Sequence, residues 1–396
     1  MKNGYCRGIS ANIILLGIVS FLNDVSSEMI MPVLPMFITA LGGAGLAVGL
    51  IGGLRDCISS ILQVLCGYWS DRTGKRKIFV WSGYLVSAVF KLSLAFCRTY
   101  PLAILLAGLE RMGKGLRTAA RDAIIADSMP AQRGKGFGVH RALDSSGAIL
   151  GSILAFLLLS LLNVGYRPVI FIAGVIGLAS LIAMRFVKDA GAQRHNISLK
   201  VGLRALPKPL RLFIVVSGVF ALGNFSYMFF IIRAQQSFSG KLSVAVPILL
   251  YALFNIVYAI LAVPFGHLSD RIGRGKVIIL GYLLFALTSF GFAAFTSLPA
   301  FVLLFALYGA TYAAIDGTQR AFVADLSCRT LEATALGTFH TTIGVSALAA
   351  GLVAGFLWQN IGASVTFIYG GVVALVATLL LIVFRGSFCR VGEPTG

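Results

Sequence analysis

The sequence predicts an all-α membrane protein with twelve transmembrane helices in two pseudo-symmetric six-helix bundles. Three observations lead to this fold class: the composition, the succession of apolar segments and an internal repeat. The chain has 396 residues, of which 58% are hydrophobic and only 12% are charged, whereas about 25% of the residues of a soluble domain are charged. So little charge cannot cover a soluble particle of this size, and we expect lipid to cover the remainder.

Twelve apolar segments follow one another along the chain, and a helix needs about 20 residues to cross the hydrocarbon core of a bilayer. The segments lie near residues 10–38, 46–69, 78–97, 101–122, 136–162, 166–186, 210–233, 243–267, 277–296, 299–321, 333–358 and 362–384. Because the connections are short, consecutive spans are expected to be antiparallel neighbours. We assign residues 1–188 to the first bundle, 189–208 to a cytoplasmic linker and 209–396 to the second bundle.

The net charge of +19 is distributed in a way that predicts the orientation of the chain. Most Lys and Arg residues fall at the termini and in the even-numbered loops, as in the stretch Arg72–Lys77. Cytoplasmic loops of membrane proteins are enriched in these residues, so both termini are predicted to lie in the cytoplasm and the protein in the cytoplasmic membrane. The basic residues form no continuous stripe, which argues against nucleic-acid binding, and their predicted partners are lipid head groups.

Several other functional classes find no support in the sequence. The six cysteines have no CxxC spacing and fall mostly in apolar segments, which indicates small buried hydrophobic residues. The four histidines form no metal-ligand pair such as HExxH, so no metal site is expected. No GxxxxGK[ST] loop suggests ATP use, and no nucleophile–base pair suggests an enzyme or a cofactor.

The two halves of the chain repeat each other. GYWSDRTGKRK, from Gly67 to Lys77, follows the second span, and GHLSDRIGRGK, from Gly266 to Lys276, follows the eighth, at an offset of 199 residues. Six spans return the chain to the same side of the membrane, so the repeat is parallel. Two such bundles are typical of transporters whose small-molecule site lies between them near the midplane.

The two GxxxDRxG[KR]x[KR] loops in this duplicated layout resemble the major facilitator superfamily, and the resemblance covers essentially the whole chain. The segments LNDVSSEMIMPVLPMF and GKGLRTAARDAIIADS resemble a prokaryotic branch of poorly defined substrate. The resemblance implies a monomeric secondary transporter that works by rocker-switch alternating access. Two features depart from the family pattern. The family's fourth-helix motif sets an Arg several residues ahead of its Gly, whereas Arg111 is closely followed by Gly113 and Gly115. Gly151 is followed by Ser152, where the antiporter motif has Gly-Pro. These departures weaken the interpretation as a drug–proton antiporter.

The same resemblance implies that the loop motif latches the two halves together in the outward-open state. Arg121 and His140, which recur as Arg320 and His340, are placed with this latch. The predicted latch residues are therefore Gly67, Asp71, Arg72, Gly74, Gly266, Asp270, Arg271, Arg121 and His140. A solvated turn that only enforces the topology remains the alternative.

The ionisable residues within the predicted spans are concentrated in the first half. Each costs about 2.5–3.5 kcal/mol on insertion scales, so each needs a structural or functional reason. Helical spacing places Asp24 and Glu28 on one face of the first span, and Glu110, Lys114 and Arg117 on one face of the fourth. The candidate residues for substrate binding and proton coupling in this half are Asn23, Asp24, Glu28, Arg55, Lys91, Glu110, Arg111, Lys114, Arg117 and Asp144.

Two interpretations of these charges remain open. In the first, which we favour for Asp56, Glu110, Arg141 and Asp144, the charges neutralise one another in buried pairs, such as Asp24 or Asp56 with Arg55, and only orient the helices. In the second, which we favour for Asp24, Glu28 and Arg111, a carboxyl group in a site of low dielectric takes up a proton near neutral pH and releases it when an arginine approaches. Such a group would couple transport to a proton or another ion.

The second half presents aromatic and amide side chains in place of charges. Tyr251 and Asn255 share a face of the eighth span, and Tyr312 and Asp316 share a face of the tenth. Amphipathic aromatic residues either line a cavity or pack in a core, and both interpretations remain open. These four residues complete the candidate substrate site.

We therefore expect a secondary transporter that moves a small solute across the membrane, with proton-coupled efflux of an amphipathic or organic solute as the leading version. Uptake or exchange of an anionic metabolite is the alternative, because Lys91, Arg111, Lys114 and Arg117 give the first half a surplus of positive charge. Outside this class, a transporter-like sensor or scaffold that moves nothing remains possible.

Overall fold

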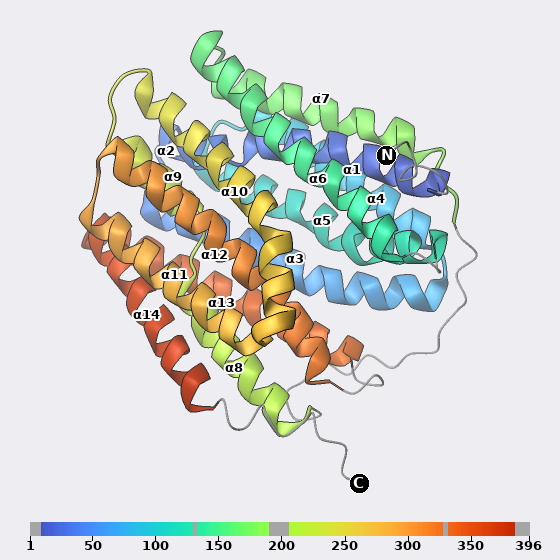
Figure 1. The fold of residues 1–396 in the computed structure, drawn as a ribbon. Coiled ribbons are helices and arrows are strands. Elements are labelled where there is room, and N and C mark those ends of the chain that lie inside the picture. Colours follow the sequence, from blue (N-terminus) through green and yellow to red (C-terminus); the bar gives the residue numbers. More distant parts are fainter. Residues whose placement is uncertain (1–8, 130–132, 190–205, 328–331, 385–396) are drawn as a thin grey trace, which may run out of the picture. The chain divides into compact units, whose positions relative to one another are not determined.

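The computed structural model describes residues 9–129, 133–189, 206–327 and 332–384, and every regular element in these ranges is a helix (Figure 1). The first half contains α1 (Ala11–Ile30), α2 (Val33–Ala40), α3 (Gly45–Thr73), α4 (Arg76–Ala95), α5 (Tyr100–Ser128), α6 (Arg133–Phe156), the π-helical turn η2 (Leu157–Leu161) and α7 (Tyr166–Met184). The second half contains α8 (Lys208–Gly223), α9 (Met228–Gln236), α10 (Leu242–Ile272), α11 (Arg274–Ala294), α12 (Leu298–Asp325), α13 (Glu332–Asn360) and α14 (Ala363–Val383).

Eleven helical segments in these ranges are long and apolar enough to cross a membrane. The helix α5, with 29 residues, has the length but carries too many charges, among them Glu110, Arg111 and Arg117. It packs along α4, which is itself one of the eleven spans. With α5 counted as the twelfth span, the predicted all-α fold is confirmed.

The first and seventh spans are each broken into two helices. The break between α1 and α2 falls at Met31–Pro32, where proline removes a backbone N–H and clashes with the preceding turn. The break between α8 and α9 covers residues 224–227, directly after Gly223. Both breaks fall in the first span of a half, although the break in the seventh span lies about six residues earlier in the repeat than the break in the first. Interrupted helices in related positions of two halves point to a binding site in transporters.

The chain divides into two compact units. Unit 1 comprises residues 1–37 and 58–198, and unit 2 comprises residues 38–57 and 199–396. The helix α3 therefore contributes to both, its first half to unit 2 and its second half to unit 1.

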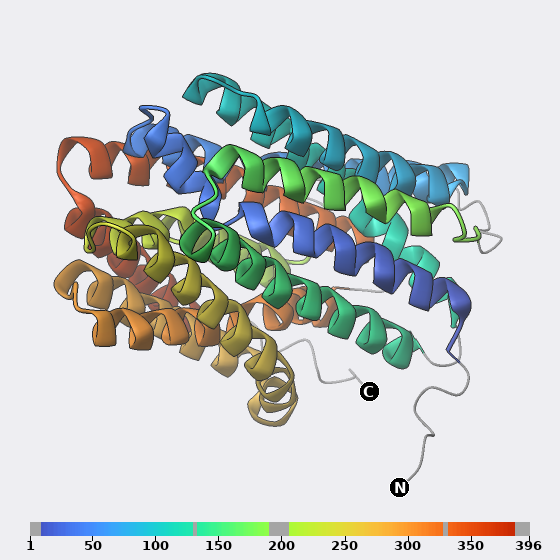
Figure 2. The same ribbon diagram turned by 90° about the horizontal axis from the view of Figure 1, so that it is seen from above.

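In unit 1, α1 packs on α6 and α7, and α4 packs on α5 and α7 (Figure 2). Glycines allow close approach at two of these contacts: Gly147 of α6 lies against the carbonyl of Phe21, and Gly83 of α4 lies against Gly113 of α5. The apolar core joins α1, α4, α5 and α7 and contains Leu16, Val19, Val80, Tyr84, Ala120, Ile124, Ile125, Met184 and Val187. Close backbone contact of this kind is how membrane helices associate without a hydrophobic driving force.

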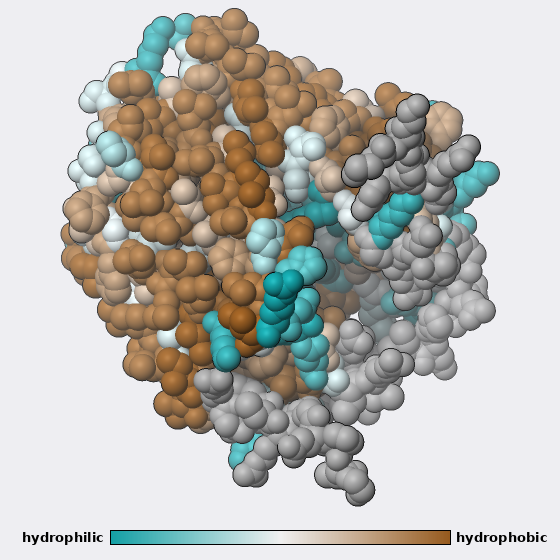
Figure 3. All heavy atoms as spheres, in the orientation of Figure 1, coloured by the Kyte–Doolittle hydropathy of each residue, from teal (hydrophilic) through white to brown (hydrophobic). Residues whose placement is uncertain are grey.

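In unit 2, α10 and α11 pack on α12, α14 packs on α8 and α11, and the core is aromatic. Phe230 stacks on Tyr308 with ring centroids 4.2 Å apart, and Phe220 stacks on Tyr282 at 3.8 Å. Figure 3 shows that apolar side chains cover most of the surface over α10, α11 and α12, as expected for a surface in contact with lipid.

The first half of α3 joins unit 2 through a glycine contact with α13. A Cβ atom on Gly49 would lie 2.0 Å from the carbonyl oxygen of Gly351, and one on Gly351 would lie 2.2 Å from that of Gly49. The backbones of α3 and α13 touch directly here, in the manner of small-xxx-small membrane contacts. The amide of Leu46 also donates to Oε1 of Gln359 at 3.3 Å.

Candidate functional site

Two carboxyl groups meet between α1 and α6. The side chains of Asp24 and Asp144 lie close enough to interact electrostatically, and the amide of Asn23 lies 3.4 Å from the Asp24 carboxyl. Arg141, one turn before Asp144, forms an ion pair with it at 3.3 Å. Two negative charges so close together are unfavourable, so a proton or a cation would stabilise this pair of acids.

Further charges surround Asp24. Glu28 follows one turn later on α1 and interacts electrostatically with Asp24, as does Arg117 from α5. The side chains of Asp24 and Glu28 are both half-buried. Gly151 of α6 would carry a Cβ only 3.0 Å from the Cβ of Glu28, so α6 approaches this turn of α1 closely.

Lys91 of α4 is buried, with 1% of its surface exposed. Its ammonium group donates to the hydroxyls of Ser26 and Ser27 at 3.0 and 2.8 Å. Ser26 in turn donates to the carbonyl of Ala173 on α7. No carboxylate in the described ranges forms an ion pair with Lys91 within 4 Å, and Glu110 and Asp24 act on it electrostatically from further away.

The polar face of α5 is held by neighbours on α4 and α1. Glu110 accepts a hydrogen bond from the Ser87 hydroxyl at 2.8 Å and lies 3.8 Å from Nε of Arg111. Nη2 of Arg111 lies 3.3 Å from the sulfur of Met31, beside the break in the first span. Lys114, predicted on the same face as Glu110, is exposed.

Arg117 and Arg121 lie further toward the C-terminal end of α5. The Arg117 guanidinium sits over the ring of Tyr84, 4.5 Å from its centroid, as in a cation–π contact. Its Nη1 atom makes no hydrogen bond in the described part of the chain. Arg121 forms an ion pair with Asp122 at 2.9 Å.

The Ser20 hydroxyl of α1 joins three helices at this level. It lies 3.1 Å from the Tyr84 hydroxyl, 2.8 Å from Nε2 of His140 and 3.4 Å from Nη1 of Arg121. Arg121 and His140 were predicted to belong to the latch. Within the described residues, neither forms an ion pair or hydrogen bond with Asp71, and both belong to the Ser20 network.

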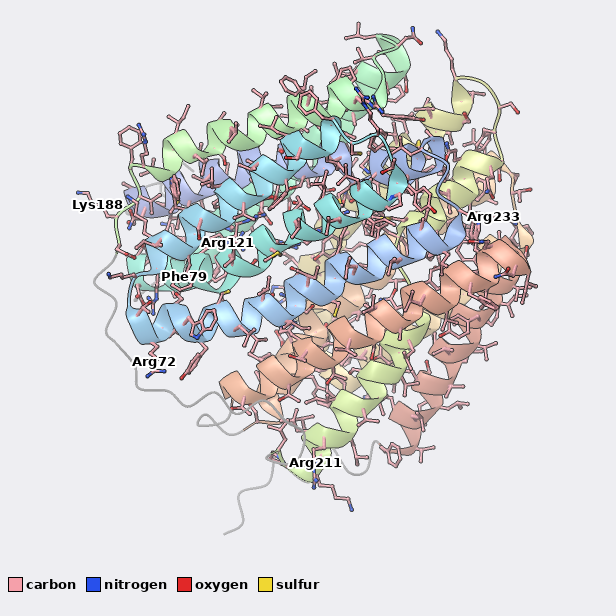
Figure 4. The ribbon with its side chains drawn as sticks, turned by 180° about the vertical axis from the view of Figure 1, so that it is seen from behind. Arg72, Phe79, Arg121, Lys188, Arg211 and Arg233 are labelled. Atoms are coloured by element: carbon pink, nitrogen blue, oxygen red, sulfur yellow. The ribbon has the colours of Figure 1, made fainter. Side chains whose placement is uncertain are left out.

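In the first loop motif one arginine pairs with two acids from different helices, an arrangement that we call a charge ladder. Arg76 at the start of α4 pairs with Asp71 at 3.3 Å and with Asp127 near the end of α5. Gly74 has a φ of +70°, a conformation that favours glycine, and makes the turn between α3 and α4. Arg72 is exposed and lies 3.4 Å from the Tyr68 hydroxyl; Figure 4 labels it at the same end of unit 1 as Lys188.

The second loop motif repeats the ladder. Arg274 pairs with Asp270 at 3.5 Å and with Asp325 at the end of α12, and Gly273 has a φ of +98°. Arg271 is exposed, and no atom lies within 4 Å of a Cβ built on Gly266.

The sequence analysis missed Arg76 and Asp127 as functional candidates. A signal was available, because both residues recur 198 positions later, as Arg274 and Asp325. Gly67, by contrast, was predicted and lies against α5, where a Cβ would fall 3.0 Å from that of Ala119.

Tyrosines from α10, α12 and the break between α8 and α9 form one aromatic surface in unit 2, which we call the tyrosine wall. The rings of Tyr251 and Tyr227 lie 5.4 Å apart, those of Tyr308 and Tyr312 lie 5.1 Å apart, and Phe254 links the two pairs. Tyr251 and Tyr312, predicted from different helices, therefore belong to one aromatic surface.

Asp316 and Asn255 lie at the edge of this wall. Asp316 accepts a hydrogen bond from the Tyr258 hydroxyl at 2.9 Å and pairs with Arg320. Asn255 is half-buried on α10, one turn after Tyr251. Arg55, on the part of α3 that belongs to unit 2, is buried with 4% of its surface exposed.

Among the described residues, no group of three or more His, Cys, Asp or Glu side chains is placed to hold a metal ion. Of the cysteines, Cys57, Cys66 and Cys97 are buried free thiols; Cys6, Cys328 and Cys389 lie outside the described residues.

Within the described residues, eleven apolar spans together with α5, a duplicated charge ladder and a broken first span in each half define a membrane transporter with two repeated halves. Residues 16–248 and 213–394 match the family model of the Major Facilitator Superfamily, and the chain belongs to this family. The protein is thus a multi-pass membrane transporter and not an enzyme.

Two relatives and one solved structure place the chain within the family. It is 52% identical over 380 residues to an uncharacterized MFS-type transporter of Methanocaldococcus jannaschii, covering 95% of each chain. It is 26% identical over 287 residues to the multidrug resistance protein MdtH of Aeromonas hydrophila, covering 71% of this chain and 70% of the relative. The crystal structure of the nucleoside transporter NupG shares the fold, with a TM-score of 0.75, 16% identity and coverage of 97% of this chain and all of that chain.

Proposed function

We propose that this transporter exports an amphipathic organic solute from the cytoplasm in exchange for protons, by rocker-switch alternating access. It acts as a monomer in the cytoplasmic membrane with both termini in the cytoplasm. The relatives named multidrug resistance protein support the export direction, and the positive-inside distribution of charge supports the orientation.

The carboxyl pair of Asp24 and Asp144 carries the proposal of proton coupling. Two neighbouring carboxyl groups favour one bound proton, because a second negative charge beside the first is unfavourable, and this pair lies between α1 and α6 in unit 1. A proton held there by two acids is lost when a cation takes its place beside them.

Two arginines are positioned to compete with that proton. Arg141 already pairs with Asp144 at 3.3 Å, and Arg117 interacts electrostatically with Asp24. A small movement of α5 or α6 would tighten either ion pair and release the proton. Asp24 and Asp144 are thus proposed as the proton-coupling groups, with Glu28 as a third acid nearby.

The charge ladders are proposed to control turnover. Asp71 and Asp270 each bond to an arginine that also pairs with an acid at the end of another helix. Because the ladder recurs in both halves, we propose that it stabilises one conformation of the transporter without touching the substrate.

The test of coupling uses proteoliposomes with an imposed pH gradient. A panel of cationic, neutral and anionic solutes is added, and proton movement is followed with a trapped pH-sensitive dye. We expect solute-dependent proton flux in the wild type and its loss in Asp24→Asn. Asp189→Asn, which changes an acid that accepts a backbone hydrogen bond from Lys77, is the control and should behave as the wild type.

Proton-coupled flux that persists unchanged in a correctly folded Asp24→Asn variant would remove Asp24 from the mechanism. An anion-dependent inward flux that ignores the pH gradient would reject export by proton exchange. That outcome would favour the alternative function.

The alternative is uptake or exchange of an anionic metabolite. One observation favours it: the buried Arg117 guanidinium has an Nη1 atom without a hydrogen-bond partner among the described residues, and Lys91 is held only by hydroxyl groups. Both cations are able to receive an anion. The same assay decides, since an anion transporter of this kind would respond to Arg117→Gln more strongly than to Asp24→Asn.

A further inference from the structure

Asp56 is an exposed acid in the middle of a membrane-spanning helix. It is the twelfth residue of the 29 in α3, and its side chain is exposed whereas its neighbours Arg55 and Cys57 are buried. No Lys, Arg or His in the described ranges lies within 4 Å of its carboxylate. A charge at this depth is costly unless it faces a cavity or a ligand.

The contacts of α3 show on which side of the helix Asp56 lies. Gly52, one turn earlier on the same helical face, would carry a Cβ 2.4 Å from that of Ser226, in the break between α8 and α9. Asp56 also interacts electrostatically with Tyr308 and Tyr312 of α12. Asp56 thus lies on the face of α3 that meets the break between α8 and α9, which is the side of the tyrosine wall of unit 2.

The wall itself presents electron-rich groups. Tyr227 and Tyr312 are half-buried, and Tyr251 and Tyr308 pack behind them. Asn224 lies in the break, and its Oδ1 has no hydrogen-bond partner among the described residues. Aromatic faces, an amide oxygen and a carboxylate all attract positive charge.

The cations closest to the wall do not neutralise Asp56. Arg320 pairs with Asp316. Arg55 projects about 100° around the helix from Asp56, is buried, and has interactions of its own. The surface beside Asp56 thus keeps an uncompensated negative charge next to apolar rings.

We propose that Asp56, Asn224 and the tyrosines 227, 251, 308 and 312 form a binding site for a lipophilic organic cation. The proposal names the substrate class of the transporter and rests on the transport function proposed above. A lipophilic cation neutralises the carboxylate, places its charge over aromatic faces and buries its apolar groups against the wall. An anion would face the Asp56 carboxylate, and a neutral solute would leave that charge uncompensated.

The test compares two ions of the same shape and opposite charge. Tetraphenylphosphonium and tetraphenylborate are titrated into the purified full-length protein in a neutral maltoside detergent, with titrations into detergent alone subtracted. We expect binding of the phosphonium ion and at least a tenfold loss of its affinity in Asp56→Asn. The charge-conserving variant Asp56→Glu should stay within a few-fold of the wild type, and so should the control Asp189→Asn.

A second pair of variants tests the aromatic wall and does not depend on the folding of Asp56→Asn. Tyr312→Phe keeps the ring and should retain most of the phosphonium affinity, whereas Tyr312→Leu removes the ring and should lose several-fold. Equal losses in both, or none in either, would exclude a cation–π contact at this position.

Stronger binding of tetraphenylborate, or unchanged phosphonium binding in a folded Asp56→Asn variant, would overturn the inference. These titrations use no gradient, so they separate the two proposals. Cation binding without proton-coupled flux would reject the coupling alone, and proton-coupled flux without cation binding would reject this site alone.

Discussion

The close contact between Gly83 of α4 and Gly113 of α5 makes Gly113→Ala a sharp test of how the charged helix is positioned. A Cβ at residue 113 would lie 2.3 Å from the carbonyl oxygen of Gly83 and 2.7 Å from the amide nitrogen of Ser87. Both are backbone atoms, so neither is able to turn away. Since an ordinary C···O contact is at least about 3.3 Å, α5 must move roughly 1 Å away from α4.

That movement would break the hydrogen bond from Ser87 to Glu110, which is 2.8 Å long and lies one turn away. Overpacking costs about 1–3 kcal/mol, and loss of a hydrogen bond to a charged group costs about 1.5–3 kcal/mol. We expect Gly113→Ala to lower the apparent melting temperature by several degrees, measured by intrinsic fluorescence in detergent.

The matched control is Gly138→Ala in α6, where no atom lies within 4 Å of the added Cβ. Here alanine should be neutral or stabilising, because it favours a helix by up to about 1 kcal/mol relative to glycine. If Gly113→Ala melts at or above the temperature of Gly138→Ala, the glycine contact does not set the distance between α4 and α5.

Three more predictions follow from single contacts. Asp71→Asn removes one partner of Arg76 and should slow turnover with little change in ligand affinity; lost affinity with normal turnover would contradict its proposed role. Gly351→Val should destabilise the protein strongly, because its side chain would enter the backbone of Gly49, and a variant as stable as the wild type would disprove that contact. Burial raises the pKa of the Cys97 thiol, so at pH 7.5 its alkylation should be slower in the folded protein than in a denatured sample and should accelerate as the pH rises. The rate is followed by peptide mass spectrometry, and equal rates in the two samples would contradict the burial of Cys97.

Much of the site was predictable because helical spacing is local. The spacing of Glu110 and Arg117 places both on one face of the fourth span, and the structure has both buried against other helices. Pro32 marks the first broken span in the sequence, because proline removes a helical hydrogen bond and favours a kink or a break, although α10 continues through Pro247 and Pro264. The break at Asn224 has no such marker in the sequence, because glycine and asparagine also occur within helices. It is seen only in the structure, where Gly223 packs against α14.

The sequence by itself determined the class of protein, the number of spans and the two loop motifs, because hydrophobicity and short-range spacing are properties of consecutive residues. Only the tertiary structure decided the partners of the charges: Asp24 meets Asp144, Lys91 meets two serines, and Asp56 lies on the side of the tyrosines of unit 2. These partners lie tens to hundreds of residues apart, and helices of equal hydrophobicity can pack in many registers. The contacts at Gly83, Gly113 and Gly147 select one register, and with it the polar pairs that the site contains.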